Sequence, residues 1–459
     1  MSTRPLRVDL DLVKKYNVPG PRYTSYPPAT LFTDRMPAGE VLDNIARKNA
    51  ASRDLSLYFH IPFCETLCWF CGCTTVITTD PRKSAAYVET LGREMERMRP
   101  LLDRGRRVVQ LHFGGGSPTF CRPDQLRRLG ALIHRHFTFA DGLEAGVEID
   151  PRRLTRDHLA ALREIGFNRA SIGVQDNHPE VQKAVHRIQP PELTAQAAGW
   201  VRETGFGSLN IDLIYGLPFQ TVASFERTLD EILELAPDRF AVFSYAHVPW
   251  MKPAQKIVEA RHLPTPETKL QLLKLTIEKL TASGYVYIGM DHFARPDDEL
   301  AVAQRAGTLQ RNFQGYSTRG GADICGFGMS SISQTQDAYW QNLKDLDAYR
   351  AKVDSGELPY ARGYLLNKDD HIRRETIMQI MCNMGVDYTA LSHRLGIDFP
   401  DYFAAELASL DDLEADGLIV RTPSRIVVTD LGRLLVRIIA MRFDAHLPKP
   451  GARRHAMTI

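Results

Sequence analysis

Apolar residues along the first two thirds of the chain form short, nearly continuous runs that alternate with amphipathic stretches. These runs are LSLYFHI (55–61), RVVQLHF (107–113), AGVEI (145–149), RASIGV (169–174), LNIDLIY (209–215) and RFAVFSYAHV (239–248). Patterns with apolar residues three and four apart follow them, as in TRDHLAALREIG and SFERTLDEILELA. Buried strands alternating with helices predict an α/β fold with a parallel sheet covered by helices. Periodicity alone leaves an open sheet and a partial barrel as alternatives.

Changes in this pattern divide the chain into three predicted parts. Residues 1–50 form an N-terminal arm whose centre, NVPGPRYTSYPPAT, is rich in turn-forming residues. Residues 51–362 hold the strands and a less regular extension, in which Gly326-Phe327-Gly328 is expected to form a turn. Residues 363–459 show helical patterns, then GLIVRTPSRIVVTD and a last helix, LGRLLVRIIAMRF. They predict a small, mostly helical, winged-helix-like C-terminal domain.

Composition excludes several classes of protein. The 459 residues include 57 Lys and Arg and 55 Asp and Glu, so the net charge is +2, without the basic field of a general nucleic-acid coat. No apolar run reaches the length of a transmembrane helix, about 18 residues or more. The charged start, MSTRPLRVDLDLVKKY, lacks the apolar segment of a secretory signal. The odd number of cysteines argues against a disulfide framework, so we expect a reducing, cytoplasmic setting.

The strongest chemical signal is a cluster of cysteines after the first predicted strand. Cys64, Cys68 and Cys71 place three thiolates on one short loop, enough to bind three irons of a 4Fe–4S cluster. The fourth iron would then be free to bind a small molecule. Zinc is the alternative, but structural zinc sites need four ligands, usually in separated pairs. We expect Cys73 not to bind the cluster, since only one residue separates it from Cys71. The scattered cysteines are expected to be small core residues: Cys121, Cys325 and Cys382.

Glycines and polar residues near the ends of the predicted strands suggest a binding site. Gly114, Gly115 and Gly116 let the backbone approach a ligand, but no Gly-Lys-Ser/Thr follows, so this is not a nucleoside-triphosphate P-loop. A tight strand-to-helix turn is the alternative. Polar residues also interrupt apolar surroundings: Glu148, Gln175, Arg187 and Asp212. Each could form an internal salt bridge or hydrogen bond, but together they would suit the ammonium, carboxylate and ribose groups of an amino-acid–nucleoside ligand.

Several motifs together resemble one enzyme family. HIPFCETLCWFCGC, FGGGSPTF, VEIDPR, NIDLIYGLP, HFARPDDELA and NFQGYST, with YNVPGPRYTSYP in the arm, are similar to oxygen-independent coproporphyrinogen III oxidases, radical S-adenosylmethionine (SAM) enzymes. The resemblance spans essentially the whole chain and implies a partial (β/α)6 barrel whose mouth holds a cluster bound by Cys64, Cys68 and Cys71. It implies a first SAM beside Tyr58, Gly115, Glu148 and Ile332. It implies a second SAM beside Phe70, Gly116, Ser117, Gln175, Arg187, Asp212 and Ala246, with Phe313 and Gln314 close by.

The resemblance also implies a reaction. Two propionate side chains of coproporphyrinogen III would be oxidatively decarboxylated to vinyl groups, which gives protoporphyrinogen IX for haem biosynthesis without oxygen. The substrate carries four carboxylates, so arginines should contact it, and Arg22 in the arm is the first candidate. We further expect an unidentified electron donor and acceptor, a monomer, and neither a membrane span nor a nucleic-acid partner.

Two other functions are alternatives. A haem-binding chaperone of the same superfamily would resemble this barrel, but such relatives generally lack the CGC ending at Cys73 and the long arm. A regulator would use the cluster to sense redox state and the C-terminal domain to bind nucleic acid. It would need a basic recognition helix, whereas LGRLLVRIIAMRF is mostly apolar and is expected to lie in the core.

Overall fold

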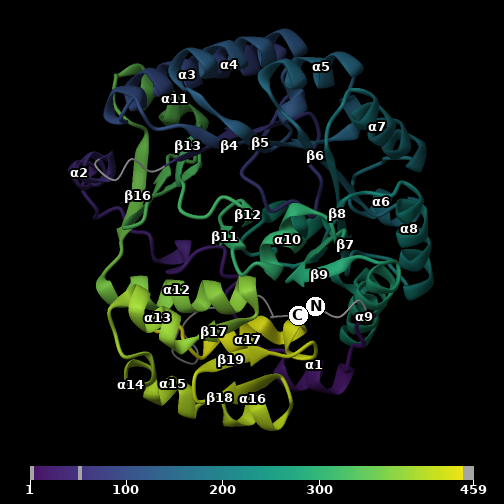
Figure 1. Ribbon diagram of the computed structural model, residues 1–459. Helices are drawn as coiled ribbons and strands as arrows, with labels where there is room; N and C mark the ends of the chain where they lie inside the picture. The colour runs from purple at the N-terminus through teal and green to yellow at the C-terminus, as the bar shows by residue number, and fades with distance from the viewer. Residues whose placement is uncertain (1–4, 50–53, 448–459) are drawn as a thin grey trace.

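Parallel strands, each followed by one or more helices, form the centre of the computed structural model, which describes residues 5–49 and 54–447 (Figure 1). They are β1 (Leu55–Ile61), β4 (Val108–Gly115), β5 (Phe139–Ile149), β6 (Arg169–Gln175), β7 (Ser208–Tyr215) and β8 (Arg239–Ser244). Each pairs in parallel with the next in this order. Consecutive parallel strands joined by helices are the arrangement of a (β/α) barrel. The α/β prediction of a partial barrel is therefore confirmed.

Helices cover the outer side of these strands (Figure 1). They are α3 (Pro81–Met98), α4 (Pro123–His136), α5 (Arg156–Ile165), α6 (Pro179–Ala184), α7 (Pro191–Glu203), α8 (Val222–Glu234) and α9 (Pro266–Ala282). Local chemistry sets their ends. The Asp80 side chain accepts the Arg82 N–H at the start of α3, and Gly166, at a φ of 115°, ends α5 in the left-handed conformation that glycine adopts without strain. Gly166 thus ends α5 shortly before β6 begins.

Further strands extend the sheet at both edges. Next to β1 lie β13 (Asp323–Phe327), which is parallel to it, and then the antiparallel strands β14 (Ile332–Gln334), β15 (Ala338–Asn342) and β16 (Tyr360–Leu365). Next to β8 lies β10 (His292–Ala294), which is antiparallel to it, and then β9 (Val286–Gly289), which is antiparallel to β10. The expected turn at Gly326 and Phe327 is thus wrong, since both residues belong to β13. A Cβ on Gly326 would lie 2.7 Å from the Ile332 carbonyl oxygen, so this glycine permits the close approach of the following strand.

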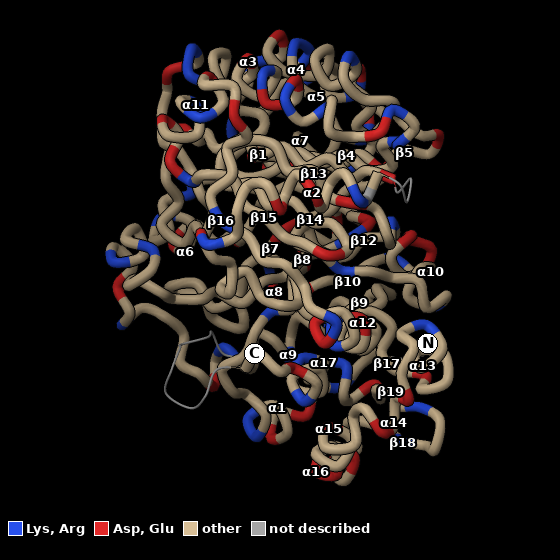
Figure 2. Tube along the Cα trace, turned by 90° about the vertical axis from the view of Figure 1, so that its left-hand side faces the viewer, with Lys and Arg blue, Asp and Glu red and all other residues tan. Residues whose placement is uncertain are grey.

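The remaining elements lie around the arm, the extension and the C-terminal region. They are α1 (Leu10–Tyr16), α2 (Ala38–Asn49), α10 (Glu299–Arg305), the hairpin β11 (Gln310–Asn312) and β12 (Gly315–Ser317), α11 (Leu346–Asp354), α12 (Lys368–Asn383), β17 (Gly385–Asp387), α13 (Tyr388–Leu395), α14 (Phe399–Tyr402), α15 (Ala404–Ala408), α16 (Asp411–Ala415), β18 (Ile419–Thr422), β19 (Arg425–Val428) and α17 (Val436–Met441). The helical pattern before GLIVRTPSRIVVTD is divided into the short helices α14, α15 and α16, and β17 adds a third strand to the pair that β18 and β19 form. Figure 2 shows α13–α16 at the end of the molecule opposite α3, α4 and α5.

Two large hydrophobic cores account for this arrangement. The first lies between the parallel strands and their helices and includes Phe59 and Phe113. The second joins the C-terminal helices to Tyr16 and Tyr23 of the arm and to Ile288 of β9. The arm therefore packs on the C-terminal region.

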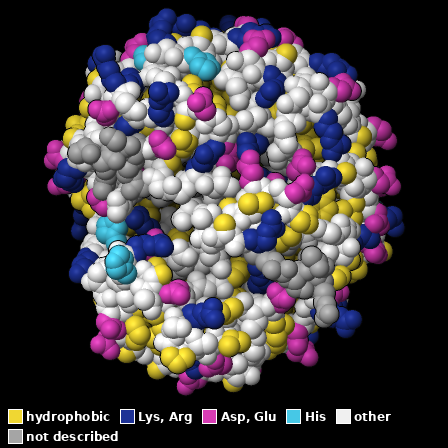
Figure 3. All heavy atoms as spheres, in the orientation of Figure 1, with side chains coloured by type: hydrophobic (Ala, Val, Ile, Leu, Met, Phe, Trp, Pro, Cys, Tyr) yellow, Lys and Arg dark blue, Asp and Glu magenta, His cyan; other side chains and the backbone are white. Residues whose placement is uncertain are grey.

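In residues 5–49 and 54–447, no helix combines the length and the apolarity that crossing a bilayer requires. Acidic and basic side chains are intermixed over the face shown in Figure 3.

Candidate active site

One cavity of about 490 Å³ lies within the parallel strands and reaches the loops that follow them. Its walls come from loops and strands that are far apart in the sequence. Ten of the predicted site residues line it: Cys64, Cys68, Phe70, Cys71, Gly115, Gly116, Glu148, Gln175, Arg187 and Asp212. The cavity is therefore built where chemistry is expected in such folds, at the carboxyl ends of parallel strands.

The cysteine loop is fastened at its ends and in its middle. Cys64 ends the short strand β2 (Phe63–Cys64), which pairs with β3 (Val76–Ile77) and so closes the loop between them. In the middle, the Trp69 N–H donates to the Val185 carbonyl over 3.0 Å, and the Trp69 ring stacks on His186 with centroids 5.2 Å apart. Within the described residues, no three His, Cys, Asp or Glu side chains converge as the ligands of one metal ion would. Cysteines that bind different irons of a cluster do not have to converge in this way.

The surroundings of the thiols act in opposite directions: burial, with the charges of Cys71 and Asp150, raises the pKa of Cys64 to about 12, whereas Cys71 is shifted toward the thiolate, the form that binds metal. One guanidinium nitrogen of Arg152 and one of Arg187 each lie 3.7 Å from the Cys68 sulfur. Hydrogen bonds from Cys73 lower the pKa of Cys71 against the effect of burial, and nearby cations, including Arg187, add to this shift. Three adjacent thiols beside two guanidinium groups fit the donor set of a 4Fe–4S cluster.

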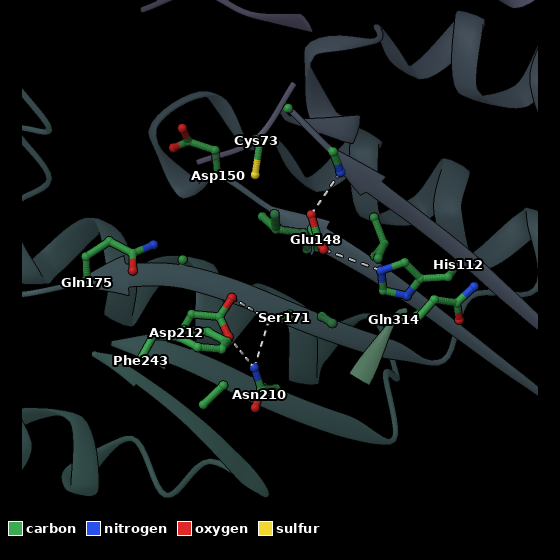
Figure 4. A pocket seen from close by; sticks show the side chains of 18 of the residues that line it. Cys73, His112, Glu148, Asp150, Ser171, Gln175, Asn210, Asp212, Phe243 and Gln314 are labelled. Atoms are coloured by element: carbon green, nitrogen blue, oxygen red, sulfur yellow. Dashed lines mark hydrogen bonds and ion pairs between the residues drawn. The ribbon is translucent and has the colours of Figure 1, made fainter. Parts of the chain in front are cut away.

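Glu148 lies near the end of β5 and presents a carboxylate to the cavity (Figure 4). Oε2 accepts the Gly115 N–H over 3.0 Å, and Oε1 lies 3.5 Å from His112 Nε2. Although burial opposes ionisation, these two groups hold the pKa of Glu148 below its usual value. Tyr58 lies behind this group, with its ring stacked on His112 and its hydroxyl 3.1 Å from His60 Nδ1. Glu148 is thus an oriented anion with 45% of its side chain accessible.

The glycines beside Glu148 are required by the packing of the loops themselves. Gly115 has a φ of 117°, and a Cβ there would lie 2.6 Å from the His60 ring. A Cβ on Gly116 would lie 2.6 Å from the Pro62 carbonyl carbon. The close packing supports the interpretation of these glycines as a tight turn. The same packing lets the Gly115 N–H donate to the Glu148 carboxylate, which supports the interpretation as part of a binding site.

Asp212 lies across the cavity from Glu148. It accepts hydrogen bonds from the Ser171 hydroxyl over 2.9 Å and from the Asn210 amide over 2.7 Å (Figure 4). Burial, together with the negative charge of Glu148, raises the pKa of Asp212 to about 6. Of these two carboxylates, Glu148 therefore ionises more readily than Asp212.

Arg187 forms a hydrogen bond and an ion pair within the protein, the contacts that the sequence analysis gave as the alternative to ligand binding. Nη2 donates to the Gly173 carbonyl over 2.6 Å, and Nη1 lies 3.4 Å from the Asp150 carboxylate. Its Nε has no partner among the described residues. Although burial opposes ionisation, Arg187 and Arg152 lower the pKa of Asp150 to about 2. Gln175, at the end of β6, has a φ of 73° and lines the same wall.

Other predicted residues lie at different places. Ser117 lines a neighbouring cavity of about 450 Å³ with Cys64 and Asp150. Among the described residues that line the main cavity, Tyr58, Ala246 and Ile332 are not found, whereas Gln314 is. Phe313 packs against Tyr339 and Phe32, away from that lining. Arg22, the arginine expected to contact the substrate, forms an ion pair with Asp291.

Sequence reasoning missed the inner part of the cavity. Residues from the interior of the barrel and from the β11–β12 hairpin line it, including Gln110, Glu144, Asn210, Phe243, His292 and Tyr316. Polar residues inside otherwise apolar strands were a usable signal for Gln110 and Asn210. The short strands that carry His292 and Tyr316 have no regular pattern from which their position could be predicted.

Comparison with known proteins identifies the family. The model of the radical SAM superfamily matches residues 58–232, and the model of the HemN C-terminal domain matches residues 366–435. The oxygen-independent coproporphyrinogen III oxidase of Pseudomonas aeruginosa is 47% identical over 456 residues, which is 99% of each chain. The chain belongs to the oxygen-independent coproporphyrinogen III oxidase family.

Other members of the oxygen-independent coproporphyrinogen III oxidase family give the same result. The protein of that name from Escherichia coli K12 is 47% identical over 447 residues, 97% of each chain. The solved structure titled "Coproporphyrinogen III oxidase (HemN) from Escherichia coli is a Radical SAM enzyme" has a TM-score of 0.92 and 46% identity, and the match covers 97% of this chain and 100% of that one. Membership of the radical SAM superfamily implies a 4Fe–4S cluster and SAM. The relatives are named as oxidases, which does not favour the chaperone alternative.

Proposed function

We propose that the protein converts two propionate side chains of coproporphyrinogen III to vinyl groups without oxygen, giving protoporphyrinogen IX. The observation that carries this proposal is the match to oxidases of that name over 99% and 97% of the chain. The cavity lined by the cysteine loop supports it, since the radical chemistry of this superfamily needs cluster and ligand in one place.

We further propose how the residues divide the cofactors. Cys64, Cys68 and Cys71 bind the cluster. The first SAM lies beside Tyr58, Gly115, Glu148 and Ile332, and a second lies beside Phe70, Gly116, Ser117, Gln175, Arg187, Asp212 and Ala246. When bound, the cluster and SAM supply the 5′-deoxyadenosyl radical that removes hydrogen from a propionate β-carbon. The protein supplies binding, orientation and exclusion of water.

Two side chains have separate electrostatic tasks in this proposal. Glu148, held by Gly115 and His112, presents an anion suited to the ammonium of SAM. Arg187 presents a cation suited to a carboxylate, and its buried Nε has no partner among the described residues. The geometry supports an anion at one wall and a cation at the other.

Partners and organisation complete the proposal. An electron donor must reduce the cluster, and an acceptor must take the electron left on the substrate when carbon dioxide leaves. We propose a monomer in the cytoplasm, with an arm at 1–50, a barrel with its extension at 51–362 and a C-terminal domain at 363–459.

The test is an anaerobic assay with coproporphyrinogen III, SAM and a reductant, scored for vinyl products. The reconstituted protein should form them, and Cys68→Ser should abolish both iron binding and turnover. Cys121→Ser is the matched control, because Cys121 is fully buried in the barrel core. This substitution should leave iron binding and turnover intact. Tight binding of haem together with no vinyl product would support the chaperone alternative instead.

A further inference from the structure

Three parts of the chain meet around Asp291, in the connection between β9 and β10. Arg22 of the arm forms an ion pair with Asp291, and the Asp291 side chain is only 12% accessible. The Arg22 guanidinium also lies 5.9 Å from the centroid of the Phe243 ring, which lines the main cavity. This contact between arm and barrel therefore lies next to the cavity wall.

Arg437 of α17 approaches the same aspartate from the C-terminal domain. Burial lowers the pKa of Arg437 to about 10, while the charge of Asp291 acts in the opposite direction. Arg437 is therefore still a cation at neutral pH. Within the described part of the chain, no hydrogen bond or ion pair involves its side chain. Asp291, the anion whose charge acts on Arg437, is already bound by Arg22.

Arg311, on the β11–β12 hairpin, is a third cation in this region, and its charge acts on His292. It is only 7% exposed, and neither Nε nor Nη1 has a partner among the described residues. Its guanidinium lies 4.7 Å from the centroid of the Tyr316 ring, and Tyr316 lines the cavity. The ring of His292, another lining residue, lies 5.2 Å from that of Tyr316, and its Nδ1 also has no partner among the described residues. Burial, followed by the charge of Arg311, lowers the pKa of His292 to about 3, so this histidine stays neutral.

The charges around this wall do not balance. The charges of Arg22, Arg311 and Asp291 all act on His292, and those of Arg22 and Asp291 act on Arg437, whereas the nearby Arg239 is matched by Asp298 at 2.7 Å. Burying an unpaired cation is costly, and the cost is recovered when an anion binds. Guanidinium groups bind carboxylates through paired hydrogen bonds.

We propose that Arg311 and Arg437 form a carboxylate-binding subsite, each receiving a propionate of the porphyrinogen, while Arg22 remains with Asp291 and holds the arm in place. This inference rests on the proposed function, which supplies a substrate with four carboxylates. The subsite lies between the barrel and the C-terminal domain, so it also assigns the C-terminal domain a role in substrate binding.

The experiment measures substrate and cofactor separately in the reconstituted enzyme. Arg311→Gln and Arg437→Gln should each raise the KM for coproporphyrinogen III about tenfold or more, the effect of losing a charge-assisted hydrogen bond. Iron per chain and the KM for SAM should stay at the wild-type values. Arg437→Lys should have an intermediate effect, since lysine keeps the charge and loses the paired geometry. Arg442→Gln is the matched control, because Arg442 is near the end of the same helix and pairs with Asp412 over 2.7 Å.

A second measurement separates this inference from the proposed function. Coproporphyrin III, titrated by fluorescence, should bind the wild type and Arg442→Gln equally and both glutamine variants more weakly. If the wild type formed no vinyl product, the proposed function would fail, and the titration would still test the subsite. Equal affinity in all variants would overturn the subsite, as would a change in the KM for SAM alone. If Arg437→Gln does not fold, Arg437→Lys and Arg311→Gln decide the question by the same criteria.

Discussion

Replacing Glu148 by glutamine should weaken the binding of SAM about tenfold and leave the cluster in place. The carboxylate already accepts one N–H from Gly115 at 3.0 Å and lies 3.5 Å from His112, which fixes its orientation. Its remaining acceptor positions face the cavity, since 45% of the side chain is accessible. Glutamine keeps the shape but turns a charge-assisted hydrogen bond into a neutral one, a loss of about 1.5 kcal/mol, or about tenfold in affinity.

The matched control is Glu144→Gln. Glu144 lies on the same strand and lines the same cavity, but it is only 8% exposed. Its oxygens are occupied by Gln110 at 3.0 Å and Thr318 at 2.9 Å. The assay measures SAM bound per chain at equilibrium and 5′-deoxyadenosine formed in a single turnover, both without oxygen. If Glu148→Gln bound SAM as tightly as Glu144→Gln does, the reasoning would be refuted.

Three further predictions concern the cysteine loop, the glycine turn and a buried acid. Cys73→Ser should keep iron and sulfide at wild-type levels, because the backbone N–H that donates to the Cys71 sulfur over 3.4 Å remains; loss of the cluster would contradict this. Gly116→Ala should lower cluster occupancy, since its Cβ would lie 2.6 Å from the Pro62 carbonyl carbon and displace the loop; an unchanged absorption spectrum would argue against it. Burial raises the pKa of Glu94 from 4.5 to about 7, so the folded state binds this proton more tightly than the unfolded state does. The free energy of unfolding should therefore fall by up to about 3 kcal/mol as the pH rises from 4.5 through 7. Denaturant unfolding at pH 5 and pH 8 should show this fall in the wild type and not in Glu94→Gln, and the same pH dependence in both proteins would exclude the carboxylate as its source.

Local sequence determined the repeating elements of this protein and predicted its cysteine chemistry. The strand predicted over 55–61 is β1, Leu55–Ile61, and the glycine that ends α5 lies one residue after it, as its backbone preference requires. Each of these features depends on neighbours a few residues away, so periodicity and residue type were sufficient. The spacing of the cysteine loop is local as well, and this is why the cluster could be predicted before the fold was known.

Only the tertiary structure decided which distant residues meet. The parallel pairing of β13 with β1 joins segments more than 250 positions apart, and a glycine-rich stretch gave no sign of it. Arg437 lies in a helix so apolar that its sequence predicts a core element, yet its cation approaches Asp291 in the barrel. The ion pair between Arg22 and Asp291 spans 269 positions. Hydrophobic patterning specifies which face of an element is buried, whereas the partner across that face depends on how all the elements pack together. The charge imbalance around Asp291 is therefore a property of the folded molecule alone.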